Sequence, residues 1–347
     1  MYTQLGIDIG SGVFLVSVAR EGIVLRDTAV IAQDRETGRV VAVGNAAEQK
    51  LNMPGQPLAF SRPFRGGLLE KPDILEAVLR NCLASVGSIS GESDLLMAVP
   101  CDMTDMQEEL LASVAKKAGA KDCHLIYAPL AAMAGTFMHM PRGCLVVDIG
   151  GTSTQVMLLC RGRIYYMKCI PYGGQHFDKA IADYLWKKRK VRVTLRVAES
   201  IKNEVGSVWA GAKNASMEVK GKDHADRPVI ITVTSAELYG ALEEPIGAIL
   251  QEVWVAVSKI PSEYVKTVFD LGIQLCGGGS ILDGLDKMIG GVTGVATRRV
   301  EDPVSCTAMG LSEILAQLPP DLPSAFRNIS EIYIKKAYQQ TNRGDLQ

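Results

Sequence analysis

Two short stretches carry the residues best suited to chemistry, and the longer is Cys144–Leu159, which reads CLVVDIGGTSTQVMLL. Asp148 follows an apolar run, Gly150 and Gly151 form a turn, and three hydroxyl residues beginning at Thr152 precede a second apolar run. Both flanks are rich in Val, Leu and Ile and too short for independent helices, which predicts a strand, a turn and a second strand. Glycine lets backbone N–H groups crowd an anion, and hydroxyl groups add donors. The stretch therefore predicts an anion-binding turn with a carboxylate at a strand end, within reach of a metal ion.

A near-copy of this stretch opens the chain. Leu5–Val18 reads LGIDIGSGVFLVSV and places Asp8, Gly10, Ser11 and Gly12 in the same order. One glycine hairpin alone is also consistent with a purely structural turn, but the duplication indicates two related halves, each with a phosphate-binding turn and a carboxylate. Mg²⁺ prefers carboxylates, waters and substrate phosphate oxygens. We therefore predict a polyphosphate ligand with Mg²⁺, clamped between the two hairpins.

Other glycine-rich phosphate motifs fit less well. Rossmann and P-loop motifs need a glycine loop that opens into a helix, whereas a second strand follows each of these turns. A third glycine loop does open into a helix: the apolar strand Ile273–Cys276 runs into Gly277, Gly278 and Gly279, and a helix is expected over Ile281–Ile289. Its N–H groups are suited to lie against a nucleotide. A plain strand-to-helix turn explains this third loop equally well.

Composition narrows the class of protein. The chain has 347 residues, enough for two domains, and 37 basic against 38 acidic residues give a net charge of −1, which offers no general reason to expect nucleic acid as a partner. The basic run Lys187–Lys190 is more consistent with a solvated helix end than with a nucleic-acid or lipid-headgroup patch. Eight cysteines without a C-x-x-C pair indicate reduced, buried thiols. Without a signal peptide or about 18 consecutive apolar residues, we expect neither export nor a membrane span.

The elements that must position these residues alternate between strands and helices, which predicts an α/β fold with mixed sheets. In the first half, a buried strand is expected at Leu95–Pro100. A helix follows that begins with the capping box Asp105-x-x-Glu108 and ends before Gly119. Its apolar face is expected to consist of Leu110, Leu111, Val114 and Ala118. A second strand and a helix of small residues are then expected at Leu125–Tyr127 and Pro129–Met138.

The second half repeats this alternation. Thr194–Val205 is expected to be a helix that carries Glu199 and Lys202 one turn apart on one face. Near the end of the chain, three prolines precede a short amphipathic segment, Phe326–Tyr338. We predict a helix there that either packs back on the first domain or hooks a partner or neighbouring subunit, and the packed alternative is the simpler one.

Taken together, the order of these segments resembles the actin superfamily and, within it, the MreB family of bacterial actins. The resemblance runs from Leu5 to about Leu315, nearly the whole chain. The matching segments are LGIDIGSG, VAVG, RPFRGGLLEKPDILEAVLR, AVPCDMTDMQ, AKKAGA, VVDIGGTST, GGQHFDKAI, AESIKNEVG and CGGGSILDGLDKM.

The resemblance implies a role for each of the singled-out residues. Asp8 and Asp148 would hold a water-bound Mg²⁺ and be the acidic residues of the catalytic centre. The phosphates of ATP would be held by Gly10, Ser11, Gly12, Gly150, Gly151 and Thr152. Glu199 and Lys202 would contact the ribose and base, and Gly277, Gly278 and Gly279 the adenosine.

The family resemblance implies an actin-like ATPase fold. Two duplicated domains would lie around a nucleotide cleft, and each would have a mixed sheet flanked by helices. We expect the first domain over residues 1–142, with a small subdomain at about 32–68. The second is expected over 143–317, with a small subdomain at about 179–240, and a C-terminal extension over 318–347.

The implied function is that of an ATP-binding bacterial cytoskeletal protein that forms filaments and helps to determine cell shape by organising cell-wall synthesis. Its implied partners are further copies of the chain and cell-wall synthesis or morphogenesis proteins. Its implied location is the cytoplasm, at the inner face of the cell membrane through those partners.

Other classes within the same superfamily stay open. A nucleotide-binding scaffold without filaments has the same motifs. A sugar kinase needs an Asp placed to deprotonate a hydroxyl, and no residue has convincing context for that role. An Hsp70-type ATPase needs a substrate-binding domain, whereas about thirty residues follow Gln317.

The sequence departs from the family pattern at three places. The family usually has a Glu that positions the attacking water where this chain has Ala128, which predicts slow or impaired ATP hydrolysis. Thr154 and Gln155 lie near the same phosphate turn and are candidates for a partial substitute. Thr152 replaces the third glycine of that turn. The segment that carries exposed apolar residues for membrane docking in the family is the polar stretch Ser88–Asp94, which does not favour direct membrane association.

Overall fold

The computed structural model describes residues 4–10, 12–51, 57–65, 68–87, 92–137, 141–209, 213–318 and 328–344. The chain divides into two units. Unit 1 comprises Met1–Pro141, Arg161–Arg163 and Ser305–Gln347, and unit 2 comprises Arg142–Cys160 and Ile164–Val304. Two of the predicted motifs, Ser11 and most of Ser88–Asp94, lie outside the described residues.

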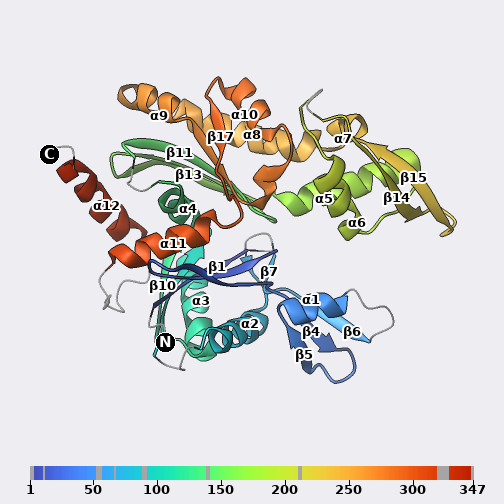
Figure 1. Cartoon of the computed structure of the whole chain (residues 1–347), viewed down its shortest axis with the longest axis horizontal. Helices are drawn as coiled ribbons and strands as arrows, with labels where there is room; N and C mark the ends of the chain where they lie inside the picture. The colour runs from blue at the N-terminus through green and yellow to red at the C-terminus, as the bar shows by residue number, and fades with distance from the viewer. Residues whose placement is uncertain are drawn as a thin grey trace. The chain divides into compact units, whose positions relative to one another are not determined.

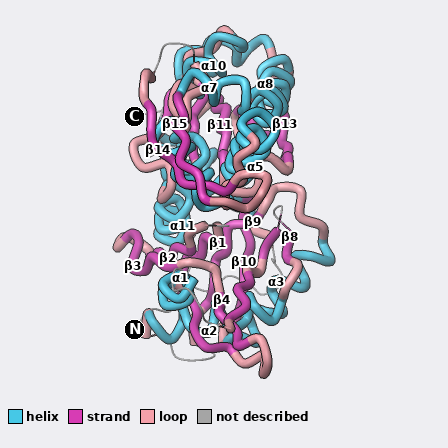
Figure 2. The backbone as a smooth tube through the Cα atoms, turned by 90° about the vertical axis from the view of Figure 1, so that its right-hand side faces the viewer, coloured by secondary structure: helices cyan, strands magenta, loops and turns pink. Residues whose placement is uncertain are grey.

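Unit 1 is built on a five-stranded sheet in the order β10-β9-β1-β2-β3. Strands β1 and β2 form the antiparallel hairpin predicted from the first Asp-Ile-Gly motif, whereas β9 and β10 run parallel to β1. Figure 2 labels these strands within unit 1. The strands are β1 (Gln4–Ile9), β2 (Phe14–Val18), β3 (Gly22–Asp27), β9 (Asp94–Val99) and β10 (Asp122–Tyr127). A mixed sheet is therefore present, as predicted.

Helices cover both faces of this sheet, because successive side chains of a strand point to opposite sides. Leu5 and Ile7 of β1 belong to the apolar core that α2 (Pro72–Ser85) and α3 (Asp105–Ala118) share. On the other face, Gly6 lies directly against Leu311. That residue belongs to α11 (Cys306–Gln317), which packs beside α4 (Ala128–Thr136) (Figure 1).

Helix α3 differs from its prediction at two points. Its capping box is formed by Thr104 and Gln107, since Thr104 adopts the extended backbone of an N-cap and each side chain bonds the other's backbone N–H. Asp105 and Glu108, the predicted pair, both fall inside the helix. Leu111, Val114 and Ala118 are buried as predicted, whereas Leu110 is 39% exposed. The buried face also includes Glu108, whose carboxylate accepts a hydrogen bond from outside the helix.

Small elements complete unit 1. A three-stranded sheet in the order β5-β4-β6 carries one short helix, α1, over its own small apolar core. These elements are β4 (Ile31–Asp34), β5 (Val40–Val43), α1 (Asn45–Leu51) and β6 (Leu58–Ser61), followed by the short pair β7 (Phe64–Arg65) and β8 (Leu68–Leu69). They span the region in which we expected a small subdomain.

Unit 2 repeats the architecture with a sheet in the order β13-β12-β11-β16-β17. Strands β11 and β12 form the second predicted hairpin, and β16 and β17 continue the sheet in parallel. The strands are β11 (Gly143–Ile149), β12 (Thr154–Cys160), β13 (Arg163–Ile170), β16 (Ile273–Cys276) and β17 (Thr297–Arg299). Every residue of β12 is buried, which explains its uninterrupted apolar run.

The helices of unit 2 bury one face each against this sheet or against the hairpin of β14 and β15. The elements are α5 (Gly174–Tyr184), α6 (Leu195–Val205), β14 (Ser216–Lys222), β15 (Pro228–Thr234), α7 (Ser235–Ala241), α8 (Glu243–Ser258), α9 (Val265–Leu271) and α10 (Leu285–Thr293). A π-helical turn, Leu185–Arg189, continues α5 and contains most of the basic run.

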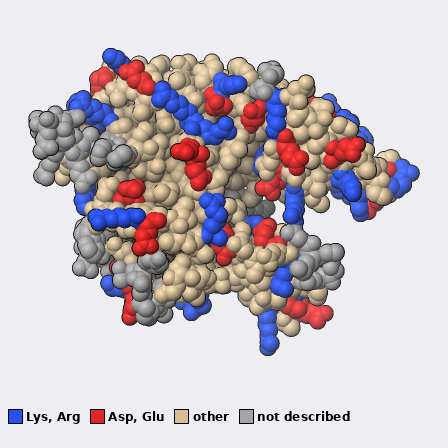
Figure 3. Space-filling model, viewed as in Figure 1, with Lys and Arg blue, Asp and Glu red and all other residues tan. Residues whose placement is uncertain are grey.

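On the face shown in Figure 3, acidic and basic side chains are interleaved.

The third glycine loop also differs from its prediction. A single 3₁₀ turn, Gly278–Ile281, follows it, and α10 begins only at Leu285. Gly284 lies between the two helical segments and has a φ of +78°, which residues other than glycine rarely adopt. The expected continuous helix over Ile281–Ile289 is therefore interrupted.

The C-terminal part of the chain packs on unit 1. From sequence we placed residues 306–317 in the second domain, but α11 packs on β1, β2 and β3. Beyond it, Asn328 forms a parallel bridge to Leu125 of β10, the edge strand in the sheet order, and Ser330 Oγ accepts a hydrogen bond from the N–H of Tyr127. Helix α12 (Ser330–Gly344) follows. This arrangement agrees with the packed alternative for the C-terminal segment.

Deleting residues 325–347 should lower the free energy of unfolding, because α12 and the residue before it bury Ile329, Tyr333 and Ile334. Burial of an apolar side chain is worth about 1.5–3 kcal/mol, so we expect a loss on the order of 3 kcal/mol or more in urea unfolding. Lys335→Ala, at an exposed position of α12, is the control that should change little. Unchanged stability together with altered assembly would support a hook to another molecule instead.

Candidate phosphate-binding site

The second hairpin has the tight glycine turn between two strands that the sequence predicts. Strand β11 ends at Ile149, which pairs with Thr154, and the N–H of Gly150 donates to the carbonyl of Ser153 at 2.9 Å. Gly150, Gly151, Thr152 and Ser153 are all partly exposed. Thr154, in contrast, is fully buried and its hydroxyl donates to the carbonyl of Tyr172 at 2.7 Å. The Thr154 hydroxyl keeps its acceptor lone pairs, but its side chain has no surface exposed to water, which disfavours it as a substitute for the Glu expected at position 128.

Asp148 stands one residue before this turn's strand end. Within the described part of the chain its carboxylate makes no hydrogen bond or ion pair, and burial raises its pKa to about 6. Gly277, with a φ of +78°, passes so close that a side chain there would collide with Asp148 Oδ1 and the carbonyl of Ile149. A desolvated carboxylate without a partner is costly, and a nearby cation favours its charged form. This pattern fits a site that holds a cation and its waters.

Two other glycine segments converge on the same turn. A side chain at Gly173 would lie 2.6 Å from the carbonyl oxygen of Gly150, and one at Gly279 would lie 3.1 Å from the same oxygen. The N–H of Gly174 donates to the carbonyl of Gly150 at 3.0 Å, and that of Gln175 to the carbonyl of Gly151 at 2.7 Å. The backbone of two other segments therefore approaches the backbone of the turn, and glycine is required for that approach. We call these segments, residues 150–151, 173–174 and 277–279, the glycine cradle.

Sequence reasoning missed one part of this cradle. Gly173 and Gly174 were matched to the family without being assigned a role in binding. The available signal was a second Gly-Gly pair directly before a helix start, the arrangement that lets backbone reach a ligand or another backbone.

Lys202 lies at the cradle, whereas Glu199 does not contact it. The ammonium of Lys202 is 2.8 Å from Asp178 Oδ1 and 3.4 Å from the carbonyl oxygen of Gly174. Glu199, one turn earlier on α6, is exposed. Gly278 has open space around it, with only a methyl of Val304 within 4 Å of an added side chain.

The remaining predicted residues belong to unit 1 and are described within it. Asp8 and Gly10 are partly exposed at the end of β1, and Gly12 is exposed in the turn that follows. Ala128 is the first residue of α4, directly after β10, and is 8% exposed. Its methyl group thus stands at the start of a helix that Pro129 also helps to begin.

Some kinds of site are absent from the described residues. No group of three or more His, Cys, Asp or Glu side chains is placed to bind a metal ion directly. All eight cysteines are free thiols, seven of them buried, as predicted from sequence. In this part of the chain no helix has the length and apolar character needed to cross a membrane.

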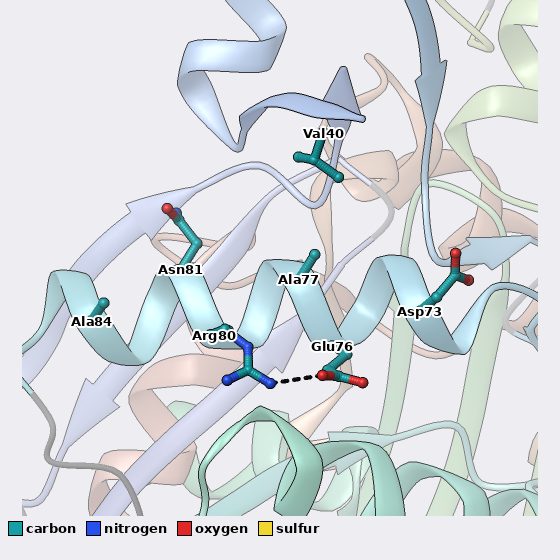
Figure 4. Close-up of a pocket in the computed structure, with 7 residues that line it drawn as sticks. All are labelled: Val40, Asp73, Glu76, Ala77, Arg80, Asn81 and Ala84. Atoms are coloured by element: carbon teal, nitrogen blue, oxygen red, sulfur yellow. Dashed lines mark hydrogen bonds and ion pairs between the residues drawn. The ribbon is translucent and has the colours of Figure 1, made fainter. Parts of the chain in front are cut away.

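An open hollow of about 560 Å³ lies on unit 1, and none of the predicted site residues is in its lining (Figure 4). Its lining residues come from the exposed side of α2 and from β5, and are Val40, Asp73, Glu76, Ala77, Arg80, Asn81 and Ala84. Arg80 pairs with Glu76 at 2.7 Å and donates to the carbonyl of Lys117, so its guanidinium is engaged. The hollow has no arrangement of groups that suggests chemistry.

Two units that each carry an antiparallel glycine hairpin continued by parallel strands, with helices packed on the sheet, define an actin-like protein. Solved structures agree with the predicted fold class. The structure of MreB5 of Spiroplasma citri bound to ADP superposes with a TM-score of 0.82 at 24% identity, covering 88% of this chain and 94% of that one. The MamK double helical filament gives a TM-score of 0.79 at 19% identity, covering 91% and 99%.

Sequence comparison identifies the family. The model of the MreB/Mbl protein family matches residues 2–320. The cell shape-determining protein Mbl of Bacillus cereus is 33% identical over 321 residues, which are 91% of this chain and 96% of the relative. The cell shape-determining protein MreB of Escherichia coli is 32% identical over 325 residues, 91% and 94% respectively. The chain belongs to the MreB/Mbl family and is a bacterial actin-like cytoskeletal protein, as the sequence motifs predicted.

Proposed function

We propose that this protein binds Mg·ATP, forms filaments in that state, hydrolyses ATP slowly, and helps to determine cell shape by organising cell-wall synthesis. One observation carries the nucleotide part: the glycine cradle of unit 2 lies beside Asp148, a partly exposed carboxylate whose pKa is raised by burial and which has no partner among the described residues. Relatives support it, since MreB5 of Spiroplasma citri has been solved bound to ADP and bound to AMPPNP.

Each predicted residue has a role in this proposal. In unit 2, the turn at Gly150, Gly151 and Thr152 would receive the phosphates and the loop over residues 277–279 the adenosine, with Glu199 and Lys202 from α6 beside the nucleotide. Asp148 would hold Mg²⁺ through water, and the ion would neutralise charge on the phosphates. In unit 1, Asp8, Gly10, Ser11 and Gly12 would have the matching roles.

Slow hydrolysis follows from Ala128. A methyl group accepts no hydrogen bond from water, so the first turn of α4 does not orient a nucleophile. Since the Thr154 side chain is fully buried, that nearby hydroxyl is not placed to replace the missing group.

The domain, partner and location assignments belong to the same proposal. We assign a small subdomain to residues at about 32–68 in the first domain and about 179–240 in the second. The partners would be further copies of the chain and proteins of cell-wall synthesis or morphogenesis. The location would be the cytoplasm, at the inner face of the membrane through those partners.

Head-to-tail assembly is the expected result when the purified protein is raised in concentration with Mg·ATP. Heterologous contacts repeat without closing, so scattering should increase sharply above a threshold concentration. MamK, which shares the fold, has been solved as a double helical filament. The measurement is light scattering against concentration with Mg·ATP and without nucleotide. A protein that stays monomeric at high concentration with Mg·ATP, across salt and pH, would contradict the filament proposal.

A further inference from the structure

The Lys202–Asp178 pair at the cradle is a charge pair in an unusually buried place. The side chain of Lys202 is 13% exposed and that of Asp178 is 8% exposed, and the ammonium lies 2.8 Å from the carboxylate. Other ion pairs of unit 2 lie nearer to solvent: Arg189 and Glu237, 2.9 Å apart, are 40% and 13% exposed. Burying two charges costs more than an exposed pair does, so such a pair needs a reason beyond the attraction of its members.

The position of the ammonium supplies that reason. A side chain at Gly174 would lie 3.4 Å from Lys202 Nζ and 3.8 Å from the Cα of Gly151. The ammonium and the phosphate-binding turn thus both lie within contact distance of a side-chain atom at position 174, so the ammonium is close to the turn. An ammonium has three donors, and Asp178 and the carbonyl of Gly174 are the two acceptors it has among the described residues.

Asp178 lies on α5, four residues after Gly174. The start of α5 is bonded to the phosphate-binding turn, because the N–H groups of Gly174 and Gln175 donate to its carbonyls. Burial raises the pKa of the Asp178 carboxyl, Lys202 opposes that rise, and the nearby Glu199 adds to it. The carboxylate thus depends on Lys202 for its charge, and it fixes in return where the ammonium points.

We propose that Asp178 is a positioning residue for the nucleotide: without touching ATP, it holds the Lys202 ammonium close to Gly151, where the ammonium attracts the anionic nucleotide. This inference rests on the proposed function, because it deepens the description of the same site. The family resemblance implies that Lys202 contacts the ribose and base. The structure, in addition, places its ammonium near Gly151 of the phosphate-binding turn.

The test is a double-mutant cycle on ATP affinity, measured by calorimetry with Mg²⁺. Asp178→Asn keeps the shape and removes the charge that holds the ammonium, and should weaken ATP binding about tenfold, a loss of the size typical for a hydrogen bond to a charged group. Lys202→Met should weaken it at least as much. If Asp178 acts only through Lys202, the double variant binds no worse than Lys202→Met alone.

Controls separate positioning from a structural role. Asp178→Glu keeps the charge and should recover part of the affinity, while Glu237→Gln, which breaks the Arg189 pair, should leave it unchanged. Wild-type affinity in Asp178→Asn, tighter binding in that variant, or additive losses in the double variant would each overturn the inference while leaving Mg·ATP binding by wild type intact. If wild type itself binds no ATP, the proposed function fails and the inference fails with it.

Discussion

Replacing Asp148 by asparagine should weaken ATP binding in the presence of Mg²⁺ by about 10–100-fold, the usual cost of losing a residue that acts on a metal through its outer shell. Binding measured without Mg²⁺ should change far less, because the amide keeps the shape of the carboxylate and removes only its charge. Calorimetry with and without Mg²⁺ measures both. Asp183→Asn, at an exposed position of α5, is the matched control. Equal ATP affinity with and without Mg²⁺, in wild type and variant alike, would refute the assignment.

The same variant should be more stable than wild type when no ligand is bound. The folded-state pKa of Asp148 is raised to about 6 by burial, above the ordinary value of 3.8. Wild-type stability should therefore fall as pH rises from about 4 to 6, by an amount on the order of 1–3 kcal/mol, and stay lower above that window. The amide introduced by Asp148→Asn does not titrate, so the gain in stability should be present at pH 8 and absent at pH 4 in urea unfolding. This opposite effect on binding and stability is typical of a functional carboxylate.

Replacing Ala128 by glutamate should raise the rate of phosphate release. Water-orienting or general-base groups are typically worth about 10²–10⁴ in rate, and the methyl group of Ala128 supplies neither function. A carboxylate at a helix start interacts favourably with the helix dipole, which offsets part of the cost of an acidic side chain at this 8% exposed position. We expect an increase of at least about tenfold in a phosphate-release assay, approaching the larger figures if the pocket is otherwise intact.

A bulky control distinguishes chemistry from packing in this experiment. Ala128→Leu adds comparable volume at an 8% exposed position but no oxygen, and should not raise turnover. Wild-type turnover that already matches active bacterial actins, and does not respond to Ala128→Glu, would show that the attacking water is held elsewhere. Nucleotide binding would be unaffected by that outcome.

The parts of the fold that the sequence predicts are those set by local pattern. The hairpins around Asp8 and Asp148, strand β16 and helix α6 depend on short-range alternation, turn glycines and caps, and all of them form as expected. The capping residue of α3 was misplaced by one position, because Thr104 and Asp105 are both good N-caps and the choice depends on which backbone turns extended.

The parts that sequence did not predict depend on contacts between distant residues. Gly173 reaches Gly150 across more than twenty positions, and the partner of Lys202 is an Asp on another helix. Helix α11 looks the same in sequence whichever sheet it covers, so only its packing on β1, β2 and β3 shows that it belongs to unit 1. Likewise, the residues from Asn328 onward find an edge strand that periodicity does not reveal.

The nucleotide content of sedimented protein tests the whole account most directly, because it joins binding, assembly and slow hydrolysis in one sample. Purified protein would be incubated with Mg·ATP, pelleted at high speed after increasing times, and its bound nucleotide separated by chromatography. We predict filamentous material by electron microscopy with about one nucleotide per chain, mostly ATP even after long incubation. A pellet that contains mainly ADP from the earliest time would contradict slow hydrolysis, and protein that neither pellets nor retains nucleotide would contradict the account as a whole.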